Sequence, residues 1–148
     1  MLSKIVATGR SDFLNQVDNS LGFPGIFRGV LDVRARTITD EMAIAAAREL
    51  ARFAEEHGIG EERLLPSMDE WEVYPRLAVA TAQKAQEQGV ARSSATAEEL
   101  YDKAWHTISS ARKATELLME GGVILPLRRF QLRPREKKSA PRLAGGAS

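Results

Sequence analysis

Residues 7–35 read ATGRSDFLNQVDNSLGFPGIFRGVLDVRA, and this stretch decides the fold class and where a ligand site should lie. The apolar run in residues 3–8 (SKIVAT) is closed by Gly9, which is typical of a short buried strand. A loop rich in Asn, Gln, Asp and Arg follows, and a helical apolar pattern begins after Phe23-Pro24-Gly25. In sheets covered by helices, ligands bind beyond the carboxyl ends of the strands, so this loop is the candidate site.

The strand has no evident partner elsewhere in the sequence. Backbone donors and acceptors of a strand need neighbouring strands, and a single strand cannot form a sheet. Either the sheet is supplied by chain that is not present here, or the segment is strained, or it is misread as a strand. We therefore expect a mostly α fold for these residues, with four to five helices and one short N-terminal strand, as a fragment of an α/β domain.

The first two helices are marked by their ends. Pro24 stands where a first helical turn tolerates proline, and a broad apolar face follows it: Ile26, Phe27, Val30, Leu31 and Val33. Thr39 is a candidate N-cap, with Asp40 and Glu41 in the first turn, and Gly58 ends this second helix. Its apolar residues predict an amphipathic to almost fully buried helix: Met42, Ile44, Ala45, Ala46, Leu50, Phe53 and Ala54.

Two more helices are expected after a turn-rich connection in which Trp71 and Tyr74 form part of an exposed acidic patch. The third spans about residues 75–88, stops at Gly89 and buries Leu77, Val79, Ala80 and Ala82. The last begins with a capping box, Thr96 with Glu99, and runs to Gly121-Gly122. Its expected inner face is Leu100, Ala104, Ile108, Ala111, Thr115 and Leu118. No repeat period is visible, which disfavours a solenoid.

Length and composition narrow the class of protein. With 148 residues, 43% hydrophobic and 28% charged, the chain has the size and composition of one ordinary globular domain. No stretch approaches the ~20 apolar residues of a membrane span, and the N-terminus lacks the apolar core of a secretory signal. We therefore expect a cytoplasmic location. The absence of Cys excludes disulfides, thiolate nucleophiles and Cys-based zinc sites, and two distant histidines predict no zinc site.

The charge is unevenly distributed along the chain. Residues 126–148 carry seven Lys or Arg and one Glu, a net of +6, so residues 1–125 carry 1 − 6 = −5. The segment 126–148 is rich in Pro and Gly and has no apolar period, which predicts a disordered basic tail. We divide the chain into a domain at 1–125 and this tail.

The motifs resemble one family closely. TGRSDFLNQVDNSLGFPGIFRGVLDVRA is similar to the malic enzyme block TGRSD, Phe or Tyr, PNQVNN, a variable pair and FPGIFRGALDVRA, which continues into TTINEEM. TITDEM at 37–42 extends the match, and WEVYPRLAVATAQKAQEQGVAR resembles a later Ala-rich segment of the family. The strong similarity covers residues 4–47, the weaker one reaches about residue 92, and none is found for 93–148.

The resemblance implies a reaction and a domain. Malic enzymes convert malate to pyruvate and CO2 by oxidative decarboxylation, with NAD or NADP as hydride acceptor and Mg²⁺ or Mn²⁺ on the substrate. The chain would be the C-terminal part of a Rossmann-like NAD(P)-binding domain. The family's Tyr and Lys acid/base pair, metal ligands and glycine-rich fingerprint lie earlier in the family's chain and are not matched here. We therefore expect the isolated chain to be inactive and to need the N-terminal part of the enzyme, in a parent that is a homo-oligomer.

Two site residues follow from the resemblance. The family's paired asparagines near substrate and nicotinamide fall on Asp18 and Asn19. The Asn19 amide offers donors and an acceptor without charge, which suits the orientation of malate; the alternative is that Asn19 caps a turn or helix. Asp18 departs from the pattern, and its carboxylate would repel a dianionic substrate. Leu14 stands where the family has Pro, so the loop loses a rigid residue.

The other polar candidates have plain structural interpretations. Arg10 and Asp12 could touch a phosphate or ribose, but a local ion pair or turn is the commoner role of such a pair. His57 lies near a helix C-terminus, where the helix dipole favours its charged form. His106 lies in a helix without a second ligand-type residue four positions away, which indicates packing or surface exposure.

Two other function classes remain open. The chain could be a non-catalytic helical interaction module that docks on a partner subunit, and a large exposed apolar patch would distinguish it. A nucleic-acid-binding role would depend on the tail, whose Arg and Lys are interleaved with Pro and accompanied only by Phe130. The sequence disfavours nucleic acid as a partner.

Overall fold

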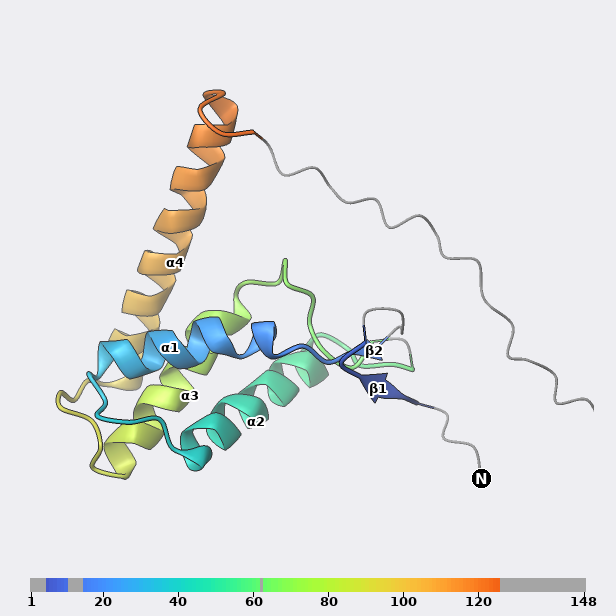
Figure 1. The fold of residues 1–148 in the computed structure, drawn as a ribbon. Helices are drawn as coiled ribbons and strands as arrows, with labels where there is room; N and C mark the ends of the chain where they lie inside the picture. The colour runs from blue at the N-terminus through green and yellow to red at the C-terminus, as the bar shows by residue number, and fades with distance from the viewer. Residues whose placement is uncertain (1–4, 11–14, 62, 126–148) are drawn as a thin grey trace, which may run out of the picture. The chain divides into compact units, whose positions relative to one another are not determined.

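The computed structural model describes residues 5–10, 15–61 and 63–125. These residues form two short strands, one 3-10 helix and four α-helices (Figure 1). The strands are β1 (Ala7–Thr8) and β2 (Asn15–Gln16), and the 3-10 helix η1 is Asn19–Leu21. The helices are α1 (Phe23–Asp32), α2 (Asp40–Glu56), α3 (Val73–Glu87) and α4 (Ala97–Glu120). The expected mostly helical fold with a short N-terminal strand is confirmed.

The two strands form a parallel pair. Ala7 lies opposite Asn15 and Thr8 opposite Gln16, and the Val17 N–H donates to the Thr8 carbonyl over 2.9 Å. The prediction that the first strand has no partner in this sequence is wrong, because β2 supplies one. Sequence reasoning missed β2 since a strand of two residues is too short to show a periodicity.

Two glycines set the distance between α1 and α3. A Cβ added at Gly25 would lie 2.3 Å from the Leu77 Cβ, and one at Gly29 would lie 2.4 Å from the Ala78 carbonyl oxygen. The two helix backbones can approach this closely only because neither position carries a side chain. This contact places α3 against α1, and α3 also packs on α2.

Because α1 turns its glycines toward α3, only part of the apolar face expected for α1 is buried. Gly25, Gly29 and Asp32 are the buried residues of this helix, whereas Phe27 and Leu31 are exposed. Phe23, Phe27 and Leu31 are spaced four residues apart and therefore share one side of the helix. We call these three residues the α1 ridge; its exposed fractions are 46%, 51% and 65%, and the two phenyl rings stack at 5.5 Å.

The core lies between α1, α2, α3 and the start of α4. Its buried residues fall into two clusters: Val33, Met42, Ala82, Ala85 and Leu100, and Ala46, Phe53, Val73, Tyr74 and Leu77. Tyr74 is only 7% exposed and Trp71 is half-buried, so the expected exposed patch at these residues is wrong. The acidic neighbours in the sequence concealed that α3 begins at Val73 and turns Tyr74 inward.

The helix ends agree with the predicted capping residues. The Thr39 hydroxyl accepts the Met42 N–H, and Thr96 and Glu99 bond each other's backbone N–H over 2.8 and 3.2 Å. Gly58 and Gly89 follow α2 and α3 with φ of +85° and +68°, a conformation that glycine adopts without strain. Of the inner face expected for α4, Leu100 and Ala104 are buried, but Ala111, Thr115 and Leu118 are exposed.

Besides its buried residues, α4 is attached by polar and aromatic contacts. Lys103 forms an ion pair of 3.0 Å with the buried Asp32 carboxylate, which also accepts two hydrogen bonds from Arg28. Trp105 packs against Trp71 with ring centroids 4.6 Å apart, and Arg112 lies over the Trp71 ring. These contacts join α4 to α1 and to the connection that precedes α3.

The chain divides into two compact units, residues 1–114 and 115–148, with the boundary inside α4. In the described part of the second unit, α4 ends at Glu120 and Gly122 adopts a φ of +69°. The Val123 N–H then donates to the Leu118 carbonyl over 2.9 Å. Residues 126–148 lie outside the described part, so the division at 125/126 and the disordered tail stay predictions. No helix among the described residues is long and apolar enough to cross a membrane.

Candidate functional site

Asp18 and Asn19 lie just beyond the carboxyl end of β2. Because β1 and β2 are parallel, their carboxyl ends, Thr8 and Gln16, lie at the same edge of the pair. That edge is where α/β domains bind ligands. Asn19 then opens η1, which leads through Gly22 into α1. The structure thus brings the two predicted residues together at the expected kind of position.

The two neighbouring side chains have different roles. The Asp18 carboxylate accepts the Ser20 N–H over 2.9 Å and is the N-cap of η1. Asn19 is exposed, and its side-chain amide has no hydrogen-bond partner within the described part of the chain. Its donors and acceptor are therefore not used by any other described residue.

Asn15 is a polar site residue that the sequence reasoning missed. It is 6% exposed, donates to the Glu61 carbonyl over 2.7 Å and accepts the Leu64 N–H over 3.1 Å. These partners are more than forty residues away in the chain, and no local pattern indicates such a contact. The sequence places an asparagine in this loop, but it does not indicate which groups the side chain binds.

A cavity of about 300 Å³ lies beside the loop. One side is formed by Asn15, Gln16 and Val17, and the other by Arg63 to Ser67 and Glu70. Burial raises the pKa of the Glu70 carboxyl, but hydrogen bonds from Ser67 and Arg63 outweigh it, and the net pKa is below its ordinary value. Glu70 is thus held as a carboxylate that pairs with Arg63 at 2.5 Å.

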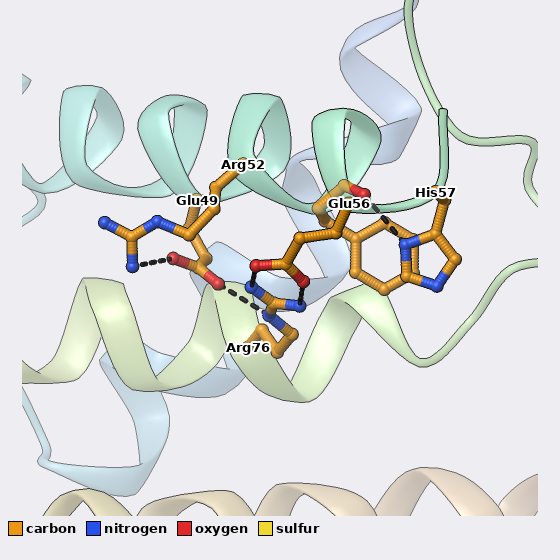
Figure 2. Close-up of polar contacts among 6 residues, drawn as sticks. Glu49, Arg52, Glu56, His57 and Arg76 are labelled. Carbon is orange, nitrogen blue, oxygen red and sulfur yellow. Dashed lines mark hydrogen bonds and ion pairs between the residues drawn. The ribbon is translucent and has the colours of Figure 1, made fainter. Parts of the chain in front are cut away.

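A second cavity, of about 390 Å³, lies beside a charged network between α2 and α3. Figure 2 shows Arg76 between Glu49 and Glu56. The Arg76 Nε lies 2.6 Å from Glu49 Oε1, and the Arg76 Nη1 lies 2.5 Å from Glu56 Oε2. The hydrogen bond from Arg76 is the main cause of the lowered pKa of Glu56. Since Arg76 is neutralised by two carboxylates and Arg52 pairs with Glu49 at 3.3 Å, the network joins two helices and offers no free anion site.

The remaining polar residues considered in the sequence lie at positions that do not form a binding site among the described residues. His57 is the C-cap of α2, so its position at the helix end is as predicted. Its Nδ1 lies 2.8 Å from the Phe53 carbonyl oxygen and its ring stacks on Phe53 (Figure 2). His106 is exposed on α4. The Arg10 N–H lies 3.4 Å from the Thr8 hydroxyl. Asp12 and Leu14 lie outside the described residues.

The resemblance implies a metal ion and a nicotinamide cofactor beside the substrate, and the described residues do not suit them equally well. No cluster of three or more His, Asp or Glu side chains in this part of the chain could hold a metal ion, so no step through a metal is assigned to it. The exposed Asn19 amide, by contrast, suits the carboxylate or hydroxyl of malate or the carboxamide of a nicotinamide.

Comparisons with known proteins agree with the motifs. A family model described as "Malic enzyme, NAD binding domain" matches residues 2–86. The chain is 46% identical over 101 residues to the bifunctional malic/malolactic enzyme of Bacillus subtilis (strain 168), covering 68% of this chain and 25% of that protein. It is also 46% identical over 102 residues to an NADP-dependent malic enzyme of Rhizobium meliloti (strain 1021), covering 60% and 13%.

Solved structures give the same result. The crystal structure of the Entamoeba histolytica malic enzyme is similar with a TM-score of 0.80 and 49% identity, over 85% of this chain and 26% of that one. The chain therefore spans about a quarter or less of the length of these relatives. The family model covers more than half of the chain, and the fold and the sequence agree with it. The chain belongs to the malic enzyme family, and residues 2–86 belong to its NAD-binding domain.

Proposed function

We propose that this chain supplies the substrate and nicotinamide side of a malic enzyme that oxidatively decarboxylates malate to pyruvate and CO2. The proposed cofactors are NAD or NADP with Mg²⁺ or Mn²⁺, and the remaining parts of the site come from the N-terminal part of the enzyme. The observation that carries the proposal is the exposed Asn19 amide, which has no partner among the described residues and lies just past the carboxyl ends of two parallel strands. A bound NAD or NADP would accept the hydride.

The proposed part of this chain in the reaction is orientation. The Asn19 amide can donate to a malate carboxylate and accept from its hydroxyl at the same time. Holding the substrate in one orientation contributes to the rate because less freedom is lost at the transition state. The Asp18 carboxylate fixes η1, and thereby the direction of Asn19, through the Ser20 N–H. No acid/base pair is assigned to the described residues.

The isolated chain should therefore give no malate-dependent reduction of NAD or NADP, with or without Mn²⁺. The measurement is absorbance at the wavelength of the reduced nicotinamide, with the Bacillus subtilis relative as the positive control. Turnover by a pure sample of this chain would contradict the assignment of the proton-transfer and metal groups to the rest of the enzyme.

A chimera tests the positive half of the proposal. Residues 2–86 replace the matched segment of the Bacillus subtilis relative, and we expect malate-dependent NAD or NADP reduction to persist. Asn19→Ala in the chimera should lower the rate at limiting malate by about tenfold or more, since one oriented hydrogen bond to a charged group is lost. A folded but inactive chimera would count against the proposed function.

The α1 ridge favours a second candidate function, an interaction module that docks on a second copy of the chain. Three large apolar side chains on one side of a helix are a recognised interaction feature, and Phe23, Phe27 and Leu31 supply them. In a parent enzyme the same ridge could contact another subunit. This candidate needs no substrate site and can be tested without one.

If the chain is such a module, it dimerises through the ridge and Phe27→Glu makes it monomeric, because a charge cannot be buried in the apolar contact without a partner. Light scattering after size exclusion, over a wide range of concentration, measures this. Ile59→Glu is the matched control, since Ile59 is 55% exposed and lies outside the ridge. A wild-type chain that is monomeric at every concentration would end this candidate.

A further inference from the structure

Asn15 is the buried residue of β2, and among the described residues its carboxamide forms hydrogen bonds to backbone groups. The side chain donates through Nδ2 to the Glu61 carbonyl and accepts the Leu64 N–H through Oδ1. A carboxamide can do both at once because it carries a donor and an acceptor on one planar group. We call these two hydrogen bonds the Asn15 staple, because they fasten β2 to a segment far along the chain.

That segment is held in shape by its own contacts. Gly60 and Arg63 exchange backbone hydrogen bonds of 2.8 and 3.2 Å, which close a turn at one end. Arg63 pairs with Glu70 at 2.5 Å, and Glu70 also accepts the Ser67 N–H over 2.7 Å. The described residues between 60 and 70 thus form a braced segment, and the Asn15 staple is made to its first turn.

The loop that follows β2 has few other attachments. Within the described residues, Val17, Asp18 and Asn19 are exposed, and the Ser20 hydroxyl reaches the Met68 sulfur at 3.5 Å, a weak contact. Val17 is tied to β1 through its N–H bond to the Thr8 carbonyl, and Asn15, three residues before Asp18, is the nearest residue whose side chain fastens β2 to the braced segment. The orientation of Asp18 and Asn19 depends on where β2 is held.

We propose that Asn15 is a positioning residue, which holds the loop of Asp18 and Asn19 against the braced segment so that the Asn19 amide faces its ligand in one orientation. This inference rests on the proposed function for the role of Asn19. The Asn15 staple itself is a property of the chain without ligand. The proposed role explains why Asn15, a buried amide whose donor and acceptor are both bonded to backbone groups, lies directly before the loop of Asp18 and Asn19.

Asn15→Asp is the decisive variant because it has the same shape and lacks the donor. In the ionised form of this variant a carboxylate oxygen would face the Glu61 carbonyl oxygen, and the repulsion would move the carboxylate away from the braced segment, so that the Leu64 N–H would lose its acceptor as well. Protonation restores the donor. The pKa of the introduced carboxyl should be above the ordinary value for Asp, about 4, since burial and the carbonyl oxygen both disfavour the charged form. The staple is then present at low pH and lost as pH rises through the raised pKa.

The charged groups around this position are few in the described residues. Arg63 and Glu70 line the same cavity and pair with each other, Glu61 contacts Asn15 through its backbone, and Asp18 lies three residues along the loop. A change with pH in Asn15→Asp that is absent from the wild type therefore reports the new carboxyl. Gln83→Glu, which adds a carboxyl at an exposed site on α3, is the matched control.

The experiment is amide NMR of the full chain between about pH 4 and pH 7.5, without substrate or nucleotide. At the upper end of this range we expect hydrogen exchange at the Leu64 N–H of Asn15→Asp to be about tenfold faster than in the wild type, or more. The Asn19 side-chain resonances should shift, whereas the α1 and α3 amides keep their protection. Both changes should reverse at the acidic end. Gln83→Glu should resemble the wild type throughout.

Unchanged Leu64 exchange and unchanged Asn19 resonances in Asn15→Asp at the higher pH would overturn the inference. Changes that spread equally over α1, α2 and α3, or that do not reverse with acid, would also overturn it, because they would make Asn15 a general stability residue. The spectra contain no ligand, so their outcome is separate from the activity of the chimera, which decides the proposed function.

Discussion

Gly29→Ala should lower the free energy of unfolding of the unit formed by residues 1–114 by about 3 kcal/mol. This value is near the upper end for overpacked positions. The new methyl carbon would lie 2.4 Å from the Ala78 carbonyl oxygen and 2.9 Å from the Thr81 Cβ. Neither atom is the end of a flexible side chain, so α1 and α3 must separate. The gain in helix propensity from Gly to Ala, about 1 kcal/mol, is too small to compensate.

Thermal and urea denaturation followed by circular dichroism measure this effect. For a unit of this size the midpoint should fall by roughly 10 °C or more. Gly22→Ala is the matched control, because an added Cβ there meets its nearest atoms at 3.6 Å and should change stability by less than about 1 kcal/mol. Equal stability of Gly29→Ala and the wild type would show that the two helices do not pack as closely as described.

Asp18→Asn should lower the KM for malate in the chimera by about tenfold or more. Two unit charges about 4 Å apart repel by about 1 kcal/mol in water and about 4 kcal/mol at an effective dielectric of about 20. Asp18 is exposed, so the smaller figure is the better guide for one carboxylate, and malate carries two. Asn caps a helix as well as Asp does, so η1 should keep its position.

Steady-state kinetics at several ionic strengths provide the test. Salt screens exposed charges, and the difference in KM between Asp18→Asn and the parent chimera should shrink as salt is added. Asp69→Asn removes the same charge from an exposed position in the braced segment and is the control. Equal effects of the two substitutions would mean that Asp18 is not closer to the substrate than a surface acid.

The features that sequence reasoning predicted well are local. Thr39 and the Thr96–Glu99 pair cap their helices as expected because a cap is decided by residues within one turn. Gly58 and Gly89 end α2 and α3 for the same kind of reason, a positive φ that other residues adopt with strain. The family motifs are also continuous in sequence, and the comparisons confirm the membership that they indicated.

The features that sequence reasoning missed depend on contacts between residues that are far apart in the sequence. Phe27 and Leu31 are exposed because Gly25 and Gly29 turn the other side of α1 toward α3, and a count of apolar residues cannot reveal that choice. Tyr74 is buried although its neighbours in sequence are acidic. Asn15 gains its role from partners at Glu61 and Leu64. The assignment of Asp18 and Asn19 to the substrate remains a prediction of the family motif.

The Trp71–Trp105 contact gives the protein a built-in optical reporter. The chain has two tryptophans, and the structure brings both into one contact between the α2–α3 connection and α4. Indoles in contact couple their excited states, so near-ultraviolet circular dichroism and fluorescence should follow this contact with little background from the rest of the chain. Detachment of α4 would then be seen as a spectral change that is distinct from the loss of helix in the other elements.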